Sequence, residues 1–477
     1  MSDWRFLDVY MSVMNRRNLK KCPISFSSSA PLAHKMKSFV TFTLLLGGAL
    51  AAPSGDFTVL SMNVAGLPAI LNSNDVPGDK TTNAKLIGSF FSKHNYSIIH
   101  AQEDFNYHAS IYATDTHPFR TSTSGGIPFG SGLNTLSNNP WLDFRRIKWA
   151  TCSDASSNDC LTPKGFTFMR LALSISSTTS TYLDVYNLHA DAGTEPGDLT
   201  ARQANINQLA SHISTWSTGN PVLVFGDTNS RYSRPLDTAI LSLLSSPSTA
   251  LSDPWLLLSR GTTTPPTTES LCSNPSPTSA CETVDKVFFR SSPLLTLTPT
   301  AYTYVGGKFL QPDGNILSDH NPVLVNFTYA AGTALQQSNL HGGPHGNWFS
   351  DVLVLAGKTA PRVQKIVLRG ASRVDGVAVT LTDGTVLKHG GEGGAEGGLV
   401  LAGGEVWVEG EMCQAQKDGR TRIFYVRAGT SSGRGVEAGT RTGECVVFRA
   451  PQGWAVVGFL GQDGSEVDQL GFVYGKQ

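Results

Sequence analysis

The segment Pro221-Val222-Leu223-Val224-Phe225-Gly226-Asp227-Thr228-Asn229-Ser230-Arg231 decides the fold class. Its apolar run does not alternate with polar residues and is rich in β-branched side chains, which is typical of a strand buried on both faces. Gly226 lets the backbone turn where the strand ends. We therefore expect Asp227 and Asn229 to project together from the carboxyl edge of a sheet, where α/β proteins keep their chemistry. Taken alone, Asp-x-Asn after a strand is more often turn chemistry than a site.

Four further apolar runs carry polar side chains at or near one end. They are Met62-Asn63 after 57–60, Gln102-Glu103 after 98–99, Asn187-Leu188-His189 after 183–186, and Ser318-Asp319-His320-Asn321-Pro322 before 323–325. Chance explains one such run easily and five poorly. We therefore expect these strand ends to meet at one site.

Between residues 55 and 329 the apolar runs alternate with segments of helical spacing. The expected helices are 82–93, 200–216 with Thr200 as a possible N-cap, and 236–244. Two segments rich in Ser, Gly and Asn, 121–139 and 261–280, are longer than ordinary connections. Loops of this length usually serve a site or lack fixed structure. The pattern predicts an α/β sandwich with functional loops at one edge.

The polar set at the strand ends suits a divalent cation. Glu103 and Asp319 offer hard oxygen ligands, and Asn63 offers an amide oxygen. Few protein ligands combined with several waters suit Mg²⁺ better than a dedicated Ca²⁺ cage, and Mn²⁺ is the alternative ion. The set lacks the thiolates and multiple histidines of a structural zinc site. We therefore predict a magnesium site built from these three residues.

The remaining polar residues suit in-line attack of water on a phosphate ester. His189 and His320 can donate to phosphate oxygens or exchange protons near neutral pH. Asp227 would align the attacking water, Asn229 would orient the phosphoryl group, and Asp285 would brace an imidazole. Residues of these types also have ordinary structural roles, as a turn cap, half of a salt bridge or a strand-end histidine. Their joint occurrence at strand ends favours the catalytic interpretation.

In this order the polar residues resemble the endonuclease/exonuclease/phosphatase superfamily, whose members include nucleases, inositol polyphosphate phosphatases and neutral sphingomyelinases. The resemblance covers roughly residues 55–329 and implies a DNase I-like fold, a four-layered α/β sandwich. The roles that it implies are metal binding by Glu103 with Asn63 and Asp319, water activation by Asp227, phosphate contact by Asn229 and His189, and pairing of His320 with Asp285.

Two sub-motifs, 102–108 and 163–166, look more like the sphingomyelinase and phosphatase branches than like DNase I itself. Lys164 in the second sub-motif is a candidate to meet a substrate phosphate, with an ordinary surface lysine as the alternative. His108 in the first is as readily structural as substrate-binding.

Residues 36–52 have the features of a secretory signal: one positive charge, a short apolar stretch and a small-x-small cleavage site. The apolar run is too short to span a membrane. Because the segment begins 35 residues into the chain, we expect Met36 to be the true start and 1–35 to be an upstream extension of the gene model. The expected product is a secreted, extracellular protein without a transmembrane segment.

The cysteines support secretion. Cys22 lies in the leader, and the other six form the near pairs Cys152 with Cys160, Cys272 with Cys281, and Cys413 with Cys445. Because no Cys-x-x-Cys occurs, short-loop disulfides are favoured over a metal site, although sequence alone leaves the pairing open. Sequons at Asn95 and Asn326 offer glycosylation sites for a glycoprotein.

After a linker of small and polar residues at 330–340, the composition changes. Residues 341–475 are rich in Gly, with short alternating strands separated by turn signals such as Asp383-Gly384 and Asp418-Gly419. This pattern indicates an all-β domain.

The segment His341-Gly342-Gly343-Pro344-His345-Gly346, together with 349–351, 366–369 and 457–461, resembles jacalin-related lectins, which form a β-prism. In that family a sugar sits between the glycine loop, here with Gly343, and a Gly-x-x-x-Asp loop, here Gly464-Ser465-Glu466-Val467-Asp468. The resemblance implies that Asp468 accepts from sugar hydroxyls and that the backbone amides of Ser465 and Glu466 donate. Two departures, the Glu466 carboxylate and an incomplete Gly-x-Gly start, leave open a domain that kept the fold and lost the sugar site.

The leading hypothesis is a secreted, Mg²⁺-dependent phosphoesterase that hydrolyses a phosphate mono- or diester, such as a phospholipid or inositol phosphate, held near glycoconjugates by its lectin domain. One alternative is a lectin or adhesin with a vestigial phosphatase domain, and another is a secreted nuclease. Residues 54–329 carry 16 Lys and Arg against 21 Asp and Glu, a net charge of −5. A protein that binds nucleic acid by neutralising phosphates should be basic, so the charge disfavours, without excluding, this partner.

Overall fold

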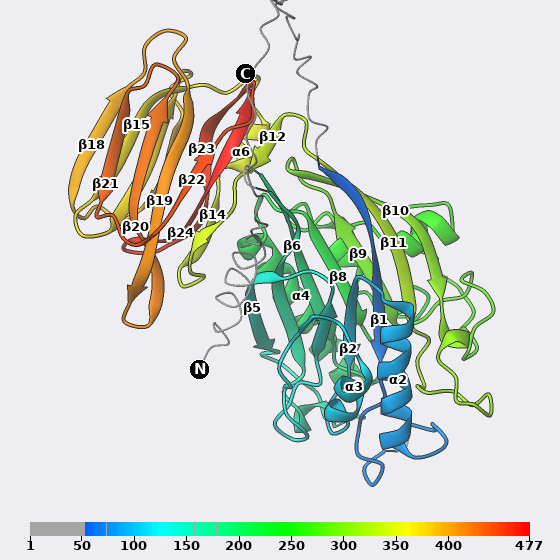
Figure 1. Ribbon diagram of the computed structural model, residues 1–477. Helices are drawn as coiled ribbons and strands as arrows, with labels where there is room; N and C mark the ends of the chain where they lie inside the picture. The colour runs from blue at the N-terminus through cyan, green and yellow to red at the C-terminus, as the bar shows by residue number, and fades with distance from the viewer. Residues whose placement is uncertain (1–52, 73, 157, 177–178) are drawn as a thin grey trace, which may run out of the picture. The chain divides into compact units, whose positions relative to one another are not determined.

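Two mixed β-sheets form the N-terminal part of the protein in the computed structural model, which describes residues 53–72, 74–156, 158–176 and 179–477 (Figure 1). The first sheet has the order β10 (Leu295–Tyr304), β11 (Val323–Ala331), β1 (Ser54–Asn63), β2 (Ile98–Gln102), β4 (Asn134–Ser137) and β3 (Phe119–Arg120). The second has the order β5 (Trp141–Lys148), β6 (Gly165–Ile175), β7 (Ser180–His189), β8 (Val222–Asp227) and β9 (Asp285–Arg290).

Strand direction brings the expected site together. β1 runs parallel to β2, and β7 runs parallel to β8. β11 is antiparallel to β1, and β9 is antiparallel to β8. The carboxyl ends of the four parallel strands therefore share one edge with the amino ends of β9 and β11. A contact between Asn63 of β1 and Asp227 of β8 joins the two sheets at this edge.

The two sheets pack face to face through a hydrophobic core crossed by a few buried hydrogen bonds. Phe57, Val59 and Ile98 of the first sheet belong to the same core as the apolar residues of β6, β7 and β8. Gln102 donates from Nε2 to Asn187 Oδ1 over 2.8 Å, which links the sheets directly beneath the site. Such satisfied buried polar pairs fix the register of one sheet on the other.

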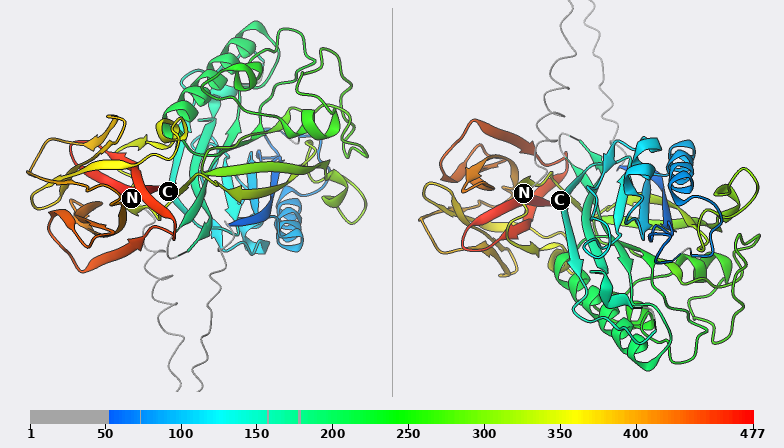
Figure 2. Two further views of the ribbon diagram at one scale, coloured as in Figure 1. Left: turned by 90° about the horizontal axis from the view of Figure 1, so that it is seen from above. Right: turned by 90° about the horizontal axis from the view of Figure 1, so that it is seen from below.

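Helices cover the outer faces of both sheets. α2 (Lys80–His94) and α3 (His108–Thr114) pack on the first sheet, while α4 (Pro196–Trp216) and α5 (Leu241–Ser245) belong to the core of the second. Figure 2 shows the blue α2 and the green helices on opposite outer sides of the sheets. Short turns of helix lie at η1 (Asp159–Leu161), η2 (Trp255–Ser259) and η3 (Gly306–Lys308). The predicted four-layered sandwich is confirmed.

The expected helices at 82–93 and 200–216 are present, but two details of the expectation are wrong. α4 begins before Thr200, because Glu195 caps it in a reciprocal capping box with Asp198. The third helix is shorter than expected at its start, because Leu236 adopts the left-handed conformation (φ 66°) that helices exclude. An ion pair of 3.0 Å between Arg234 and Asp237 holds that turn instead.

Three antiparallel sheets form the C-terminal part. The first has the order β12 (Leu335–Gln337), β24 (Val467–Lys476), β23 (Trp454–Asp463) and β14 (Asn347–Ser350), with β13 (His341–Gly342) paired to β24. The second has the order β17 (Val386–Gly390), β16 (Val374–Leu381), β15 (Val363–Gly370) and β18 (Ala395–Val400). The third has the order β21 (Gly435–Gly439), β20 (Arg420–Thr430), β19 (Trp407–Lys417) and β22 (Glu444–Arg449). One short helix, α6 (Val352–Ala356), follows β14. Trp407 packs edge-on against Phe459 and Phe472 at the centre of the core. The expected all-β domain is confirmed.

The segment expected to be a linker, 330–340, contains the end of one strand and a second short strand. β11 continues to Ala331, and β12 begins at Leu335 and pairs with β24. Local composition misses this because the partner of β12 lies at the far end of the sequence. The expectations for residues 1–35, the signal at 36–52 and Cys22 concern residues outside the described ranges. Among the described residues, no helix combines the length and apolarity needed to cross a membrane.

Three disulfides confirm the expected cysteine pairs, Cys152–Cys160, Cys272–Cys281 and Cys413–Cys445. The two sequons differ in setting. Asn95 is exposed at the C-cap of α2, whereas Asn326 is half-buried within β11. Asn95 is therefore the more accessible site for a glycan.

Candidate active site

Asp227, the last residue of β8, lies at the centre of the converging strand ends. It is buried, and its Oδ2 lies 3.3 Å from Asn63 Nδ2, 3.4 Å from His189 Nε2 and 3.9 Å from His320 Nε2. Burial raises the pKa of Asp227, against the opposing attraction of His320. A carboxylate that is poorly solvated, with two imidazoles in reach, is suited to accept a proton from water.

His320 and Asp285 form a hydrogen-bonded pair in the site. His320 Nδ1 donates to Asp285 Oδ2 over 2.8 Å. Burial opposes protonation of His320, but the carboxylates of Asp285 and Asp227 outweigh it and raise its pKa well above the usual value. His189 has the opposite character: burial, reinforced by the Lys164 and His320 charges, lowers its pKa well below the usual value. The site therefore contains one cationic and one neutral imidazole.

Asn229 follows the strand end in a left-handed conformation, with a φ of 50°. Its backbone N–H donates to Asp227 Oδ1 over 2.9 Å, and its side-chain Nδ2 donates to Ala190 O over 3.1 Å. Asparagine tolerates this conformation better than most residues. The turn therefore orients the Asp227 carboxylate as well as the Asn229 amide.

Glu103 carries the features of a cation ligand. It also has a positive φ of 54°, which is uncommon for a non-glycine residue and clusters at functional sites. Its Oε1 accepts from Asn63 Nδ2 over 3.0 Å, while its Oε2 is buried without a hydrogen-bond partner among the described residues. Burial raises the pKa of Glu103, and the nearby Asp319 charge adds to the rise. A buried, half-satisfied carboxylate beside a second carboxylate fits a divalent cation.

The three expected metal ligands differ in how they face the site. Asn63 Oδ1 accepts from the backbone N–H of Ala65 over 3.0 Å, so its amide nitrogen, rather than its oxygen, faces Glu103. Asp319 is exposed and accepts from Asn74 Nδ2 over 3.2 Å. Asp227, Asp285 and His320 also have ligand-capable atoms within 4.8 Å of one another. The Asp285–His320 hydrogen bond and the raised pKa of His320 favour a proton-handling trio over a metal cage.

The two expected substrate-binding residues have local partners. Lys164 forms an ion pair with Asp159, and its charge acts on Glu103, His189 and Asp227. His108 Nδ1 lies 2.7 Å from Asp104 Oδ2, and Asn134 Nδ2 donates to the same carboxylate over 2.7 Å. Lys164 thus lies within electrostatic range of the site, while His108 belongs to a network that supports the loop after β2.

Lys80 is a supporting residue that sequence patterns did not reveal. It is buried in the first turn of α2, and its Nζ donates to the carbonyls of Ala65, Leu67 and Asn72. Because Asn74 also accepts from Lys80 and donates to Asp319, this lysine ties the loop after β1 to the candidate metal site. Only the position of a lysine at a helix start, an unremarkable signal, marks it in the sequence.

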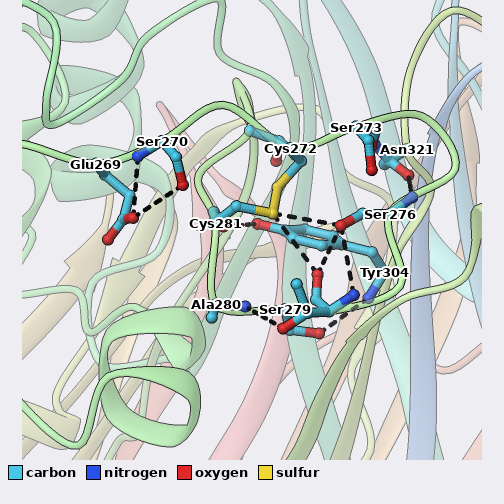
Figure 3. Close-up of a disulfide and its surroundings, with 12 residues drawn as sticks. Glu269, Ser270, Cys272, Ser273, Ser276, Ser279, Ala280, Cys281, Tyr304 and Asn321 are labelled. Atoms are coloured by element: carbon cyan, nitrogen blue, oxygen red, sulfur yellow. Dashed lines mark hydrogen bonds between the residues drawn. A yellow bond between two sulfur atoms is a disulfide. The ribbon is translucent and has the colours of Figure 1, made fainter.

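The disulfide loop 272–281 braces the segment that carries His320. Figure 3 shows Asn321 beside this loop, where Asn321 Oδ1 accepts from the Ser276 N–H over 2.9 Å. Asn321 Nδ2 donates to Ser273 O over 2.8 Å, and Asn274 Nδ2 donates to Ser318 O over 2.8 Å. The covalent loop therefore holds the backbone on both sides of His320.

Replacing Cys272 and Cys281 together with serine is expected to lower turnover about 10-fold, because small displacements of catalytic groups are costly. It should also lower the free energy of unfolding by about 2–3 kcal/mol, since the unfolded chain gains entropy. The matched control is the Cys413→Ser, Cys445→Ser pair, which removes the disulfide between β19 and β22. Equal losses of turnover in the two double variants, measured below their unfolding temperatures, would contradict this positioning role.

The glycine loop and the Gly-x-x-x-Asp loop of the C-terminal part also meet. The Gly343 N–H donates to Asp468 O over 2.9 Å, and a side chain at Gly346 would collide with Asp468 Oδ2. Gly464, Ser465, Glu466 and Asp468 line one pocket with His345, Gly346 and Asn347. Val467 is buried in the core instead.

Arg422 of β20 is an unexpected member of this second site. It forms ion pairs with Asp468 and, over 3.5 Å, with Glu466. Glu466 is held in addition by Arg373 and Lys417. Lys417 and Arg422 come from β19 and β20, and Arg373 from the turn between β15 and β16. All three are distant in sequence from the loop, so the loop motif gave no sign of them.

Comparisons with known proteins agree with this two-part organisation. Residues 44–253 match the model of the Endonuclease/Exonuclease/phosphatase family 2, and residues 338–473 match that of the Jacalin-like lectin domain. The N-terminal sandwich therefore has the expected DNase I-like fold and the C-terminal part the expected jacalin-like fold.

A sphingomyelinase from Mycobacterium bovis is 36% identical over 285 residues, which cover 58% of this chain and 54% of the relative. The chain thus spans about half the length of the curated relatives it matches. Sphingomyelinase C from Streptomyces griseocarneus is 17% identical with a TM-score of 0.39, covering 57% of this chain and 99% of that structure. AcmJRL, a mannose binding jacalin related lectin from Ananas comosus, is 22% identical with a TM-score of 0.26, covering 30% and 99%.

Proposed function

We propose that this chain, which contains an endonuclease/exonuclease/phosphatase family domain and a jacalin-like lectin domain, is a secreted, metal-dependent phosphodiesterase that cleaves sphingomyelin-like phospholipids at glycosylated surfaces. The observation that carries the proposal is the arrangement around Asp227, with His189, Asn63 and the His320–Asp285 pair at one sheet edge. The 36% identity to a sphingomyelinase supports the choice of substrate.

The proposed mechanism assigns one task to each side chain. Asp227 aligns the attacking water and takes its proton, because its carboxylate is buried and poorly solvated. His320, kept cationic by Asp285, stabilises charge on the phosphate oxygens or protonates the leaving alcohol. His189 and Asn229 contact the non-bridging oxygens. In-line displacement at phosphorus requires this combination of aligned water and charge-stabilising donors.

Glu103 and Asp319 would hold the cation, Mg²⁺ or Mn²⁺, with Asn63 once its amide turns its oxygen toward them. The Oε2 of Glu103, which has no hydrogen-bond partner within the described part of the chain, and the oxygen-only donor set fit such an ion. When bound, the cation supplies charge neutralisation at the phosphate. Lys164, whose charge acts on Glu103, would meet a substrate phosphate.

Glu103→Gln is expected to abolish metal-dependent turnover, with a loss of about 10²–10⁴-fold, because it removes the anionic ligand. The assay is hydrolysis of sphingomyelin, inositol phosphates, a generic phosphodiester and plasmid DNA, with and without EDTA. A second readout is the rise in unfolding temperature on adding Mg²⁺, which the variant should lose. The matched control is Asp56→Asn, an exposed carboxylate near the other end of β1.

Chelator-sensitive hydrolysis of sphingomyelin alone supports the proposal. Preference for plasmid DNA would favour the nuclease alternative. Inactivity on the whole panel, together with glycan binding, would favour a lectin whose first domain is vestigial.

A further inference from the structure

A few residues of the phosphodiesterase part pack into the hydrophobic core of the lectin part. The chain from Pro53 to Gln477 belongs to one compact unit, and Tyr182, Ala172 and Leu294 of the first part join the core of the second. The Arg170 guanidinium, paired with Asp184 over 2.8 Å, stacks on Trp348 at 3.5 Å from the ring centroid. The Trp348 Nε1–H donates to Thr218 O over 3.0 Å. These contacts fix the surface that each part presents beside the other.

The lectin loops open onto a pocket of about 370 Å³ along this seam. That volume lies within the range of small-molecule sites, about 300–1,000 Å³. Arg145 of β5 and Trp216 at the end of α4, both from the phosphodiesterase part, complete a wall otherwise formed by the lectin residues named above. The lectin fold alone therefore does not make the whole pocket.

The carboxylates that line the pocket already form ion pairs or hydrogen bonds with other groups of the lectin part. Asp468 pairs with Arg422, and Glu466 is surrounded by three cationic side chains. Asp463 Oδ2 accepts from the Gly390 N–H over 2.6 Å. On the lectin side, an arriving ligand therefore meets carboxylates whose charge is largely compensated.

The opposite wall carries a less tightly held cation. The Arg145 guanidinium lies 3.7 Å from the Trp216 ring centroid, and Trp216 stacks in turn on His212. The polar contacts of Arg145 with Asp143 and Gln462 are all 3.4 Å or longer. A guanidinium stacked on an aromatic face keeps its in-plane N–H groups directed outward, where they can pair with a planar anion.

The charge around His345 agrees with a cationic wall. His345 lines the same pocket. Burial is the largest cause that lowers the pKa of His345. The charges of Arg422, Arg420 and Arg145 lower it further, and the charge of Asp143 opposes them. The cationic groups that act on His345 are therefore Arg422, Arg420 and Arg145, against the one carboxylate of Asp143.

We propose that Arg145, held by Trp216, makes the lectin site a composite one that selects oligosaccharides carrying a carboxylate or sulfate next to the sugar bound by the Gly464–Asp468 loop. The inference rests on the carbohydrate-binding part of the proposed function. The ligand spans both parts of the protein, so its recognition depends on the phosphodiesterase domain as well as on the lectin loops.

The test is glycan binding by the full chain and its variants. The array prints neutral oligosaccharides beside acidic counterparts, such as lactose with 3′-sialyllactose and 3′-sulfolactose, and mannobiose with its 6-sulfate. Arg145→Ala is expected to weaken binding of the acidic member about 10- to 100-fold, the usual effect of losing a charge-assisted hydrogen bond, and to leave the neutral member within about twofold. Arg145→Lys should recover part of the loss, and Trp216→Phe should show a smaller loss of the same selectivity.

The matched control is Arg449→Ala, which removes a largely exposed arginine from β22 of the lectin part. Asp468→Asn should weaken acidic and neutral members alike, because it alters the loop side of the pocket. Equal binding of neutral and acidic members by the unaltered protein, or unchanged selectivity in Arg145→Ala, would overturn the composite site. Absence of all glycan binding would overturn it together with the carbohydrate-binding part of the proposed function.

Discussion

Under the proposed function, Asp227→Asn is expected to lower turnover of sphingomyelin about 10²–10⁴-fold while leaving the protein as stable as the unaltered chain. The amide has the shape of the carboxylate and can still accept from the Asn229 N–H, but it cannot take a proton from water. Burying the charged carboxylate costs free energy, and this cost raises the pKa of Asp227. The neutral amide of the variant does not carry that cost. We therefore expect the unfolding temperature to change by no more than about 4 °C.

Steady-state kinetics and thermal unfolding of the same preparation check this prediction. The loss should appear in kcat and in kcat/KM together, because alignment of the water matters in the transition state. Asp56→Asn serves as the control for removal of a carboxylate from the domain. Retention of more than about a tenth of the activity would assign the general base to another residue.

Asp285→Asn is expected to move the alkaline limb of the pH–rate profile to lower pH and to reduce turnover at pH 8 about 10²-fold. Asp285 is the first of the carboxylates that keep the pKa of His320 well above its usual value. Without that charge the imidazolium deprotonates nearer to its ordinary pKa, about 6.5. The acidic limb should change less, since Asp285 does not take the proton from water in the proposed mechanism.

The same pair predicts how stability depends on pH in metal-free protein. The folded-state pKa of His320 is raised, so the folded state binds the proton more tightly than the unfolded state. Its contribution is fully present below the unfolded value of about 6.5 and is lost as pH rises through the folded pKa. Urea unfolding in EDTA at several pH values should show this loss in the unaltered protein and a smaller one in Asp285→Asn. The pairing would be contradicted if the free energy of unfolding fell equally steeply with pH in the two proteins. It would also be contradicted if the alkaline limb of the pH–rate profile did not move in Asp285→Asn.

Much of the candidate site follows from local sequence because strand direction brings the motifs together. The apolar run before Asp227 marks a central buried strand, and two parallel strand pairs place Asn63, Glu103 and His189 at the same edge. The three disulfides could also be suggested from local sequence, because each joins two cysteines that are neighbours along the chain. Local sequence therefore shows well which polar residues stand at the ends of apolar strands.

The remaining features depend on partners distant in sequence. Lys80 supports the site through carbonyls of a loop whose path no periodicity describes. Arg422 reaches Asp468 from another sheet, and β12 pairs with the last strand of the chain. The early start of α4 and the late start of α5 follow from a capping box and a left-handed turn. Propensity and spacing do not specify such arrangements.

The pairing of terminal strands has a consequence for how the two parts are joined in one chain. Ser54 lies opposite Ala330 across β1 and β11, and Leu335 lies opposite Gly475 across β12 and β24. Each part thus begins and ends at neighbouring points of its own sheet, and the chain passes between them only through residues 332–334. A change in the length of that junction would therefore leave the strand pairing of both parts intact. The packed seam between the parts, by contrast, depends on matched residues from both of them, such as Arg170 and Trp348.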